Sequence, residues 1–223
     1  LASLEIQPAI DAAPDQRGAT LILPAGDYLV SPVRIRSRVR LHLEPGARLW
    51  GSPKLADYMP QPRSQSITFG HSLGRETEQG LERLISAIDA QDITVTGQGQ
   101  ISNQSPAWAF PWLNTRPGPK LAKRPRDMLL FHRCSGVSVE GIRIVDSAFW
   151  TLVFDQCDGV RVDGITIRNF DLLNADGIDL HESSNVRISN CHIHCQDDAI
   201  CLKTSHPDSA VRNVTVSNCV IRT

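Results

Sequence analysis

The chain has 223 residues, of which 41% are hydrophobic and 21% are charged, and its formal net charge at pH 7 is −1. This composition is typical of a globular protein and allows one large core in a single elongated domain. The near-zero charge argues against a broad nucleic-acid surface, and no run of 18 apolar residues suggests a membrane span, so we expect neither nucleic acid nor a membrane as a partner.

The first predicted element is a short helix within residues 4–13, where apolar side chains recur at roughly helical spacing. Pro8 restricts where this helix can begin. The sequence starts at Leu1 without the basic, apolar and small-residue pattern of a signal peptide, so we expect an N-terminus that was trimmed or cut from a longer chain.

Strands are predicted next, with long segments between them. Residues 39–46 and 93–101 alternate apolar and polar positions and include Gly near their ends. The segments 51–84 and 102–126 are rich in Pro, Ser, Gln, Arg and Lys. We expect these two segments to be surface excursions.

The second half of the chain repeats. The segments 137–144, 160–167, 186–193 and 214–221 match column by column, and their starts are 23, 26 and 28 residues apart. Periods of this length are typical of solenoid proteins. Within each segment the apolar residues alternate on both sides of a two-residue interruption, which predicts two strands joined by a tight bend.

Two positions in each repeat are always Gly or Asn, the residues that accept a positive φ at the lowest cost. They are Gly136, Gly159, Asn185 and Asn213 before the first strand, and Gly141, Gly164, Asn190 and Asn218 at the bend. A left-handed residue at the same places turns every repeat the same way. We therefore expect an all-β fold, a parallel β-helix with a continuous apolar core, capped at its start by the helix within residues 4–13.

The end of the sequence shows no matching cap. The chain stops at Thr223, directly after a full repeat. Because an open coil exposes unpaired strand edges, we expect residues 1–223 to be one β-helix domain that forms the N-terminal part of a longer protein. We expect a monomer.

All six cysteines lie between Cys134 and Cys219. No closely spaced Cys-x-x-Cys pairs are present, so a zinc framework is not expected. Cys134 and Cys157 occupy equivalent positions in successive repeats, as do Cys191 and Cys219. We expect them to fill the core as small apolar side chains, with disulfides between stacked neighbours as the alternative.

Two acidic motifs, at residues 174–180 and 196–202, lie 22 residues apart. In register, Asp176 and Asp198 occupy one column on neighbouring coils, about 4.8 Å apart, with Asp197 beside them. Carboxylates this close share protons, bind a cation or use perturbed pKa values for chemistry. Hydrogen bonding of Asp within turns would explain one motif, but it explains the recurrence poorly.

The motif Asn174-Ala175-Asp176 resembles the Asn-Thr-Asp motif of the polygalacturonase-like glycoside hydrolases, glycoside hydrolase family 28, and Gln196-Asp197-Asp198 resembles the family's Gly-Asp-Asp. The resemblance implies a right-handed, single-stranded parallel β-helix of the pectin-lyase-like kind. It also implies that Asp197 is the general acid and that Asp176 and Asp198 activate the attacking water in an inverting cleavage of pectin-type polysaccharides, without a metal or cofactor.

The resemblance extends over most of the chain. Residues 19–28 and 39–52 are similar to the family's first strand and second coil, and residues 124–131 and 149–152 to the coils that approach its active site. The family's Gly-His-Gly and Arg-x-Lys motifs are absent from these 223 residues. A secreted or periplasmic location is implied by the same resemblance.

Four further residues are candidates for substrate binding. In the alternation of residues 178–181, Asp179 and His181 face outward, as Lys203 does in the next coil, and Trp150 precedes a strand in the column of the first acidic motif. Lys203 would hold a sugar hydroxyl or a uronate carboxylate, or would neutralise the acids. The alternatives are a solvated surface position for His181 and packing under a loop for Trp150.

Three functions compete. Glycoside hydrolysis needs one protonated carboxyl and one ionised carboxyl, which clustered acids can supply. The second hypothesis is a non-catalytic carbohydrate-binding or tailspike-like β-helix whose acids bind calcium or sugar. The third is a calcium-dependent polysaccharide lyase.

Overall fold

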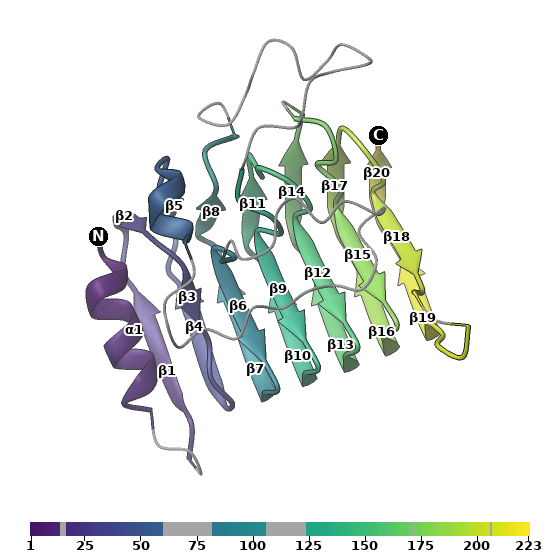
Figure 1. Ribbon diagram of the computed structural model, residues 1–223, viewed down its shortest axis with the longest axis horizontal. Coiled ribbons are helices and arrows are strands. Elements are labelled where there is room, and N and C mark those ends of the chain that lie inside the picture. Colours follow the sequence, from purple (N-terminus) through teal and green to yellow (C-terminus); the bar gives the residue numbers. More distant parts are fainter. Residues whose placement is uncertain (14–16, 60–81, 106–123, 171, 206) are drawn as a thin grey trace.

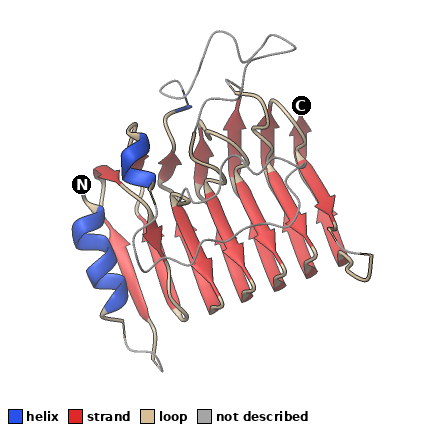
Figure 2. Ribbon diagram, in the orientation of Figure 1, coloured by secondary structure: helices blue, strands red, loops and turns tan. Residues whose placement is uncertain are grey.

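The structure is a computed structural model that describes residues 1–13, 17–59, 82–105, 124–170, 172–205 and 207–223. In these residues the strands form three parallel sheets, and each coil of the chain except the last passes through all three sheets in turn (Figure 1). The helical segments lie toward the N-terminal end, and strands make up the rest of the regular structure (Figure 2). The prediction of an all-β, right-handed parallel β-helix is therefore confirmed.

The three sheets are named A, B and C. Sheet A contains β1 (Ala19–Leu23), β4 (Val39–Leu43), β7 (Gln91–Gly97), β10 (Ser135–Glu140), β13 (Asp158–Asp163), β16 (Ser184–Ser189) and β19 (Arg212–Ser217). Sheet B contains β2 (Gly26–Val30), β5 (Ala47–Gly51), β8 (Gln100–Ser102), β11 (Arg143–Val145), β14 (Thr166–Asn169), β17 (His192–Cys195) and β20 (Val220–Arg222). Sheet C contains β3 (Val33–Arg34), β6 (Ile85–Ile88), β9 (Leu129–His132), β12 (Leu152–Asp155), β15 (Ile178–His181) and β18 (Ile200–Lys203).

The register of the four aligned repeats is confirmed. Val137, Val160, Val186 and Val214 pair in sequence across sheet A. The isoleucines that close the four repeats pair in the same way across sheet B. Both columns are buried in the interior except at the last coil, where Val214 is half-buried and Ile221 is exposed. Each buried aliphatic side chain contributes about 1.5–3 kcal/mol.

The predicted left-handed positions are also confirmed. All four residues at the bend between sheets A and B have positive φ, from 53° at Asn218 to 72° at Gly141. The second column, near the start of each sheet A strand, has φ between 53° and 71°. Because every coil turns at these two places, coils of different length still stack in register.

Helix α1 (Ser3–Asp11) covers the first coil, as predicted (Figure 1). Its Ile6 and Ile10 are buried in the common core. The Gln7 side chain accepts the backbone N–H of Arg34 at 2.7 Å and donates to the carbonyl of Arg34 at 3.0 Å. This amide satisfies the edge of β3 in place of another strand.

Pro8 was expected to limit the start of the helix, yet it lies inside α1. The helix continues past it because Ile6, Ile10 and the contact of Gln7 with the strand edge fix both sides of the proline. Burial of the apolar face therefore outweighs the one backbone hydrogen bond that proline cannot donate.

The two predicted surface excursions differ in part from the structure. Residues 60–81 and 106–123 lie outside the described residues. The described ends are not all at the surface, since Tyr58 and Leu84 are fully buried and the Tyr58 hydroxyl donates to the Asn103 side-chain oxygen at 2.7 Å. The polar composition of the two segments did not indicate these buried residues, because a few apolar side chains are enough to anchor the ends of a polar segment in the core.

All six cysteines are free, and Cys134, Cys157, Cys191 and Cys195 are buried. The predicted role as core-filling side chains is confirmed for Cys134, Cys157 and Cys191, whereas Cys219 on the last coil is only half-buried, and the alternative of disulfides between stacked neighbours is not seen. No helix in the described ranges is long and apolar enough to cross a membrane.

Candidate active site

The two acidic motifs meet where the chain enters sheet C. Ile178 pairs with Ile200, so Asp176 and Asp198 stand two positions before the paired residues of β15 and β18. The N–H of Gly177 donates to the carbonyl of Asp198 at 2.8 Å, and the N–H of Thr151 donates to the carbonyl of Asp176 at 3.1 Å. The acids therefore occupy one column on neighbouring coils, as their spacing predicts.

The same column continues to earlier coils. Leu129 and Leu152 pair in sheet C, which puts Asp127 and Trp150 at the positions equivalent to Asp176. Asp127 is fully buried and accepts a hydrogen bond from Arg83 Nε at 3.1 Å. Sequence reasoning missed Asp127, although counting two residues back from Leu129 would have found it.

Lys203 lies between two carboxylates. Its Nζ is 3.3 Å from Asp176 Oδ2 and is also hydrogen-bonded to Asp179 Oδ1. The indole ring of Trp150 completes the contact, with its centroid 3.8 Å from Nζ. The structure thus brings together four of the residues singled out from the sequence, and we call Asp176, Asp179, Lys203 and Trp150 the lysine cluster.

The side chain of Asp179 faces outward from the coil, as expected, but it is fully buried. Burial is the largest influence on its carboxyl and raises its pKa to about 7, while Lys203 opposes the rise and Asp176 adds to it. Burial likewise raises the pKa of Asp176 to about 6, again opposed by Lys203 and reinforced by the negative charge of Asp197. The sequence predicted a raised pKa from crowding, whereas the main cause is desolvation.

Two oxygens in the lysine cluster, Asp176 Oδ1 and Asp179 Oδ2, are buried without a hydrogen-bond partner in the described part of the chain. Burial disfavours the ammonium of Lys203, but Asp179 and Asp176 outweigh it and raise the lysine pKa. Two carboxyls around one cation can therefore hold a proton near neutral pH and titrate together.

Asp197 and Asp198 lie on the more open side of the cluster. Asp197 is half-buried and Asp198 is exposed, and the backbone N–H of Asp198 donates to Asp197 Oδ1 at 3.1 Å. Their charges both raise the pKa of Asp176. The site therefore combines a buried acid that holds its proton more strongly with two carboxyls that substrate can reach.

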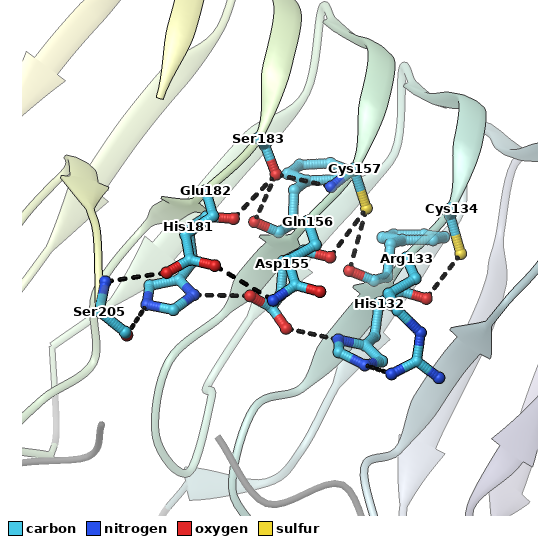
Figure 3. Close-up of polar contacts among 12 residues, drawn as sticks. His132, Arg133, Cys134, Asp155, Gln156, Cys157, His181, Glu182, Ser183 and Ser205 are labelled. Carbon is cyan, nitrogen blue, oxygen red and sulfur yellow. Dashed lines mark hydrogen bonds and ion pairs between the residues drawn. The ribbon is translucent and has the colours of Figure 1, made fainter. Parts of the chain in front are cut away.

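His181 belongs to a second network, beside the lysine cluster. Its Nδ1 is 2.6 Å from Asp155 Oδ1, and its Nε2 contacts the hydroxyl of Ser205. Figure 3 shows His181 and His132 on either side of Asp155, with Ser205 beyond His181. Both ring nitrogens of His181 thus have protein partners, and its side chain is only 15% exposed, which differs from the solvated position considered for it.

The hydrogen-bond partners in this network show which ring nitrogen of His132 carries a proton and why Asp155 is ionised. The guanidinium of Arg133 donates to His132 Nε2 at 2.7 Å, so His132 Nδ1 carries the proton given to Asp155. Burial disfavours ionisation of Asp155, but the hydrogen bonds from His132 and His181 outweigh it and lower the pKa of this carboxyl. The result is a buried aspartate held ionised by two imidazoles.

This network fixes the end of β18. Besides the contact between Ser205 and His181, the N–H of Ser205 donates to Glu182 Oε1 at 2.9 Å. Ser205 lies two residues after Lys203, and His181 pairs with Lys203 across the sheet. The strand that presents Lys203 to the acids is therefore anchored on its far side. Asp155 was missed in the sequence, although it occupies the column of His181 and Lys203.

The site offers little to a metal ion. No group of three or more His, Cys, Asp or Glu side chains is arranged to hold one in the described ranges. Between Asp176 and Asp179 the positive charge is the ammonium of Lys203. The arrangement suits proton transfer better than the calcium binding considered from the sequence.

Comparison with known proteins gives a consistent picture. The profile of the family described as Glycosyl hydrolases family 28 matches residues 53–223. A probable polygalacturonase from Vitis vinifera is 26% identical over 193 residues, which cover 84% of this chain and 37% of that protein. The chain therefore spans little more than a third of the length of this curated relative.

Two solved structures share the fold. A polygalacturonase from Erwinia carotovora superimposes with a TM-score of 0.78 at 21% identity, over 98% of this chain and 59% of that one. A family 28 exopolygalacturonase from Yersinia enterocolitica gives a TM-score of 0.78 at 21% identity, over 98% of this chain and 45% of that one.

Proposed function

Because the chain belongs to glycosyl hydrolases family 28, we propose that it carries the acid and base groups of an inverting glycoside hydrolase that cleaves a pectic polysaccharide. Asp197 is the general acid, and Asp176 with Asp198 activates water. The observation that carries this proposal is the stacking of the two acidic motifs in one column around Lys203.

The reaction follows from the different surroundings of the acids. Asp197 gives a proton to the glycosidic oxygen while water attacks the anomeric carbon from the opposite face. Asp176 takes the proton from this water, and its raised pKa, about 6, makes its carboxylate a stronger base than an exposed aspartate.

The remaining members of the site position substrate. Lys203 neutralises Asp176 and Asp179 and, when sugar binds, gives a hydrogen bond to a hydroxyl or to a uronate carboxylate. Half-buried Trp150 offers the rest of its ring to a sugar face. His181 contributes less directly, because its two ring nitrogens are engaged by Asp155 and Ser205.

The proposal also covers the domain organisation, oligomeric state and location of the enzyme. Residues 1–223 act as a single monomeric β-helix domain, the N-terminal part of a longer enzyme, working on polysaccharide outside the cytoplasm. Neither a non-catalytic sugar-binding role nor a lyase is favoured, because the family match and the proton-holding acids both support hydrolysis. Fractionation of the producing cell and light scattering would test location and oligomeric state.

The test is release of reducing ends from a panel of pectic polysaccharides, with this chain and the complete gene product measured side by side. We expect products that do not absorb in the ultraviolet, an initial anomer inverted relative to the substrate by NMR, and no activity after Asp197→Asn with an unchanged circular dichroism spectrum. An unsaturated product would indicate a lyase. An active Asp197→Asn enzyme would remove Asp197 as the acid.

A further inference from the structure

The outer face of sheet B carries basic side chains on consecutive strands. Arg168, His194 and Arg222 pair in sequence across β14, β17 and β20. Arg143 on β11 and His192 on β17 lie in the neighbouring outward column. We call these five residues the sheet B patch. Four of them are exposed, and His194 is half-buried.

Within the described residues, no carboxylate neutralises the charges of the patch. None of its five residues forms an ion pair with a carboxylate of the described residues. Other arginines do form such pairs: on sheet A, Arg161 lies 3.2 Å from Asp163, and after β9, Arg133 lies 2.6 Å from Asp89. Arg48, earlier in the outward column of sheet B that contains Arg143, lies 3.3 Å from Asp27. Like charges on adjacent strands repel each other, so Arg143 on β11 and Arg168 on β14 are a local cost to stability in a chain whose net charge is only −1.

An aromatic side chain organises part of the patch. The rings of Phe170 and His194 meet edge to face with centroids 3.7 Å apart, and the guanidinium of Arg168 lies 5.6 Å from the Phe170 centroid. Partial desolvation, followed by the charges of Arg222 and Arg168, lowers the pKa of His194. The three arginines therefore supply the fixed positive charge near neutral pH.

We propose that the sheet B patch binds a polyuronate chain, a polysaccharide with a carboxylate on each sugar, at a surface separate from the catalytic acids. Guanidinium groups bind carboxylates through two parallel hydrogen bonds. A chain that crosses the strands meets Arg143 on β11 and Arg168 on β14, one strand spacing of about 4.8 Å apart along the axis, and then Arg222 on β20, two spacings farther on. The choice of a polyuronate depends on the proposed function, whereas binding of a polyanion depends on the patch alone.

The patch lies on strands that lead directly into the loops carrying the catalytic acids, so binding there can support catalysis. Strand β17 ends at Cys195, two residues before Asp197, and β14 leads through the next loop to Asp176. A polymer held on sheet B is therefore tethered beside the loops that carry the acids. Its free segments reach the site at a raised local concentration.

The experiment compares two variants with equal charge change, both carrying Asp197→Asn so that substrate is not consumed. The patch variant is Arg143→Glu, Arg168→Glu and Arg222→Glu. The control variant is Arg40→Glu, Arg187→Glu and Arg212→Glu, three exposed arginines on the strands of sheet A. Binding of polygalacturonate, trigalacturonate and neutral galactan is measured by calorimetry at low and at physiological salt.

We expect the patch variant to lose about tenfold or more in affinity for polygalacturonate at low salt, and the control variant to lose less than threefold. Neutral galactan, which has no carboxylate, should bind both variants alike, and trigalacturonate, with only three carboxylates, should lose less affinity for the patch variant than polygalacturonate does. Equal polymer affinity of the two variants, with melting curves that show both are folded, overturns the proposal. Hydrolysis by the unmodified chain is measured separately. If the chain binds the polymer at the patch but does not cleave it, the proposed function is refuted and the proposed binding at the sheet B patch is not.

Discussion

Replacing Asp179 with Asn should remove a pH-dependent cost to folding. Asp179 is fully buried and its pKa is raised from 3.8 to about 7, mainly by desolvation. The folded protein therefore keeps a proton on this carboxyl that the unfolded chain has already lost. The contribution of Asp179 to the free energy of unfolding is at its maximum below pH 3.8 and decreases as the pH rises to about 7.

The magnitude follows from the linkage between proton binding and folding. Each pH unit between the two pKa values changes the free energy of unfolding by about 1.4 kcal/mol. Between pH 5 and pH 7.5 the wild-type chain should lose about 3 kcal/mol through Asp179, because the loss stops near pH 7. Asp179→Asn cannot ionise, so it should gain about 3 kcal/mol relative to wild type over this interval.

The assay is urea unfolding followed by circular dichroism at pH 5, 6, 7 and 7.5, for wild type, Asp179→Asn and a control. Asp158→Asn is the matched control, since hydrogen bonds from Ser184 and Asn185 lower the pKa of Asp158 and keep it ionised across the whole interval. Its stability relative to wild type should not change with pH. A flat difference for Asp179→Asn, or one that falls with pH, would refute the assignment of Asp179 as a buried proton holder.

Three further changes test the surrounding structure. Lys203→Met removes the cation that lowers the pKa of Asp176, so the acidic limb of the pH–rate profile should move to higher pH. An acidic limb at the same pH as in the wild type would contradict the role of Lys203. Asp155→Asn deprives two imidazole N–H groups of a charged acceptor. It should lower the free energy of unfolding in urea by about 2–3 kcal/mol, and a loss under about 0.5 kcal/mol would argue against the role of Asp155. Gly97→Ala would bring a Cβ to 2.0 Å from the Leu43 carbonyl oxygen, whereas Gly164→Ala meets nothing within 4 Å. Melting curves should show a loss of about 1 kcal/mol for Gly164→Ala and a clearly larger one for Gly97→Ala.

The periodic part of the fold was predictable because its determinants are local. Gly or Asn at two fixed positions turns each coil, and alternating apolar residues define its inner face. Once the coils are aligned, Asp176 and Asp198 must share a column, because parallel pairing fixes which residues are neighbours. The capping helix was equally visible, although the helix runs through Pro8 rather than being limited by it.

The electrostatics of the site were not predictable in this way. The sequence located Asp179 on an outward face, but only the packed coils show that this face is covered and that burial, more than crowding, raises its pKa. The roles of Asp127 and Asp155 were missed for the same reason, since both depend on partners from other coils.

The sequence by itself therefore determined the β-helix, its register and the column that holds the acids, because backbone conformation and side-chain alternation are properties of short segments. The tertiary structure alone decided which carboxyls are desolvated, that Lys203 lies between two of them, and that His181 is engaged by Asp155 and Ser205. Desolvation and ion pairing depend on every group within a few ångströms, and those groups come from coils more than 20 residues apart in the chain.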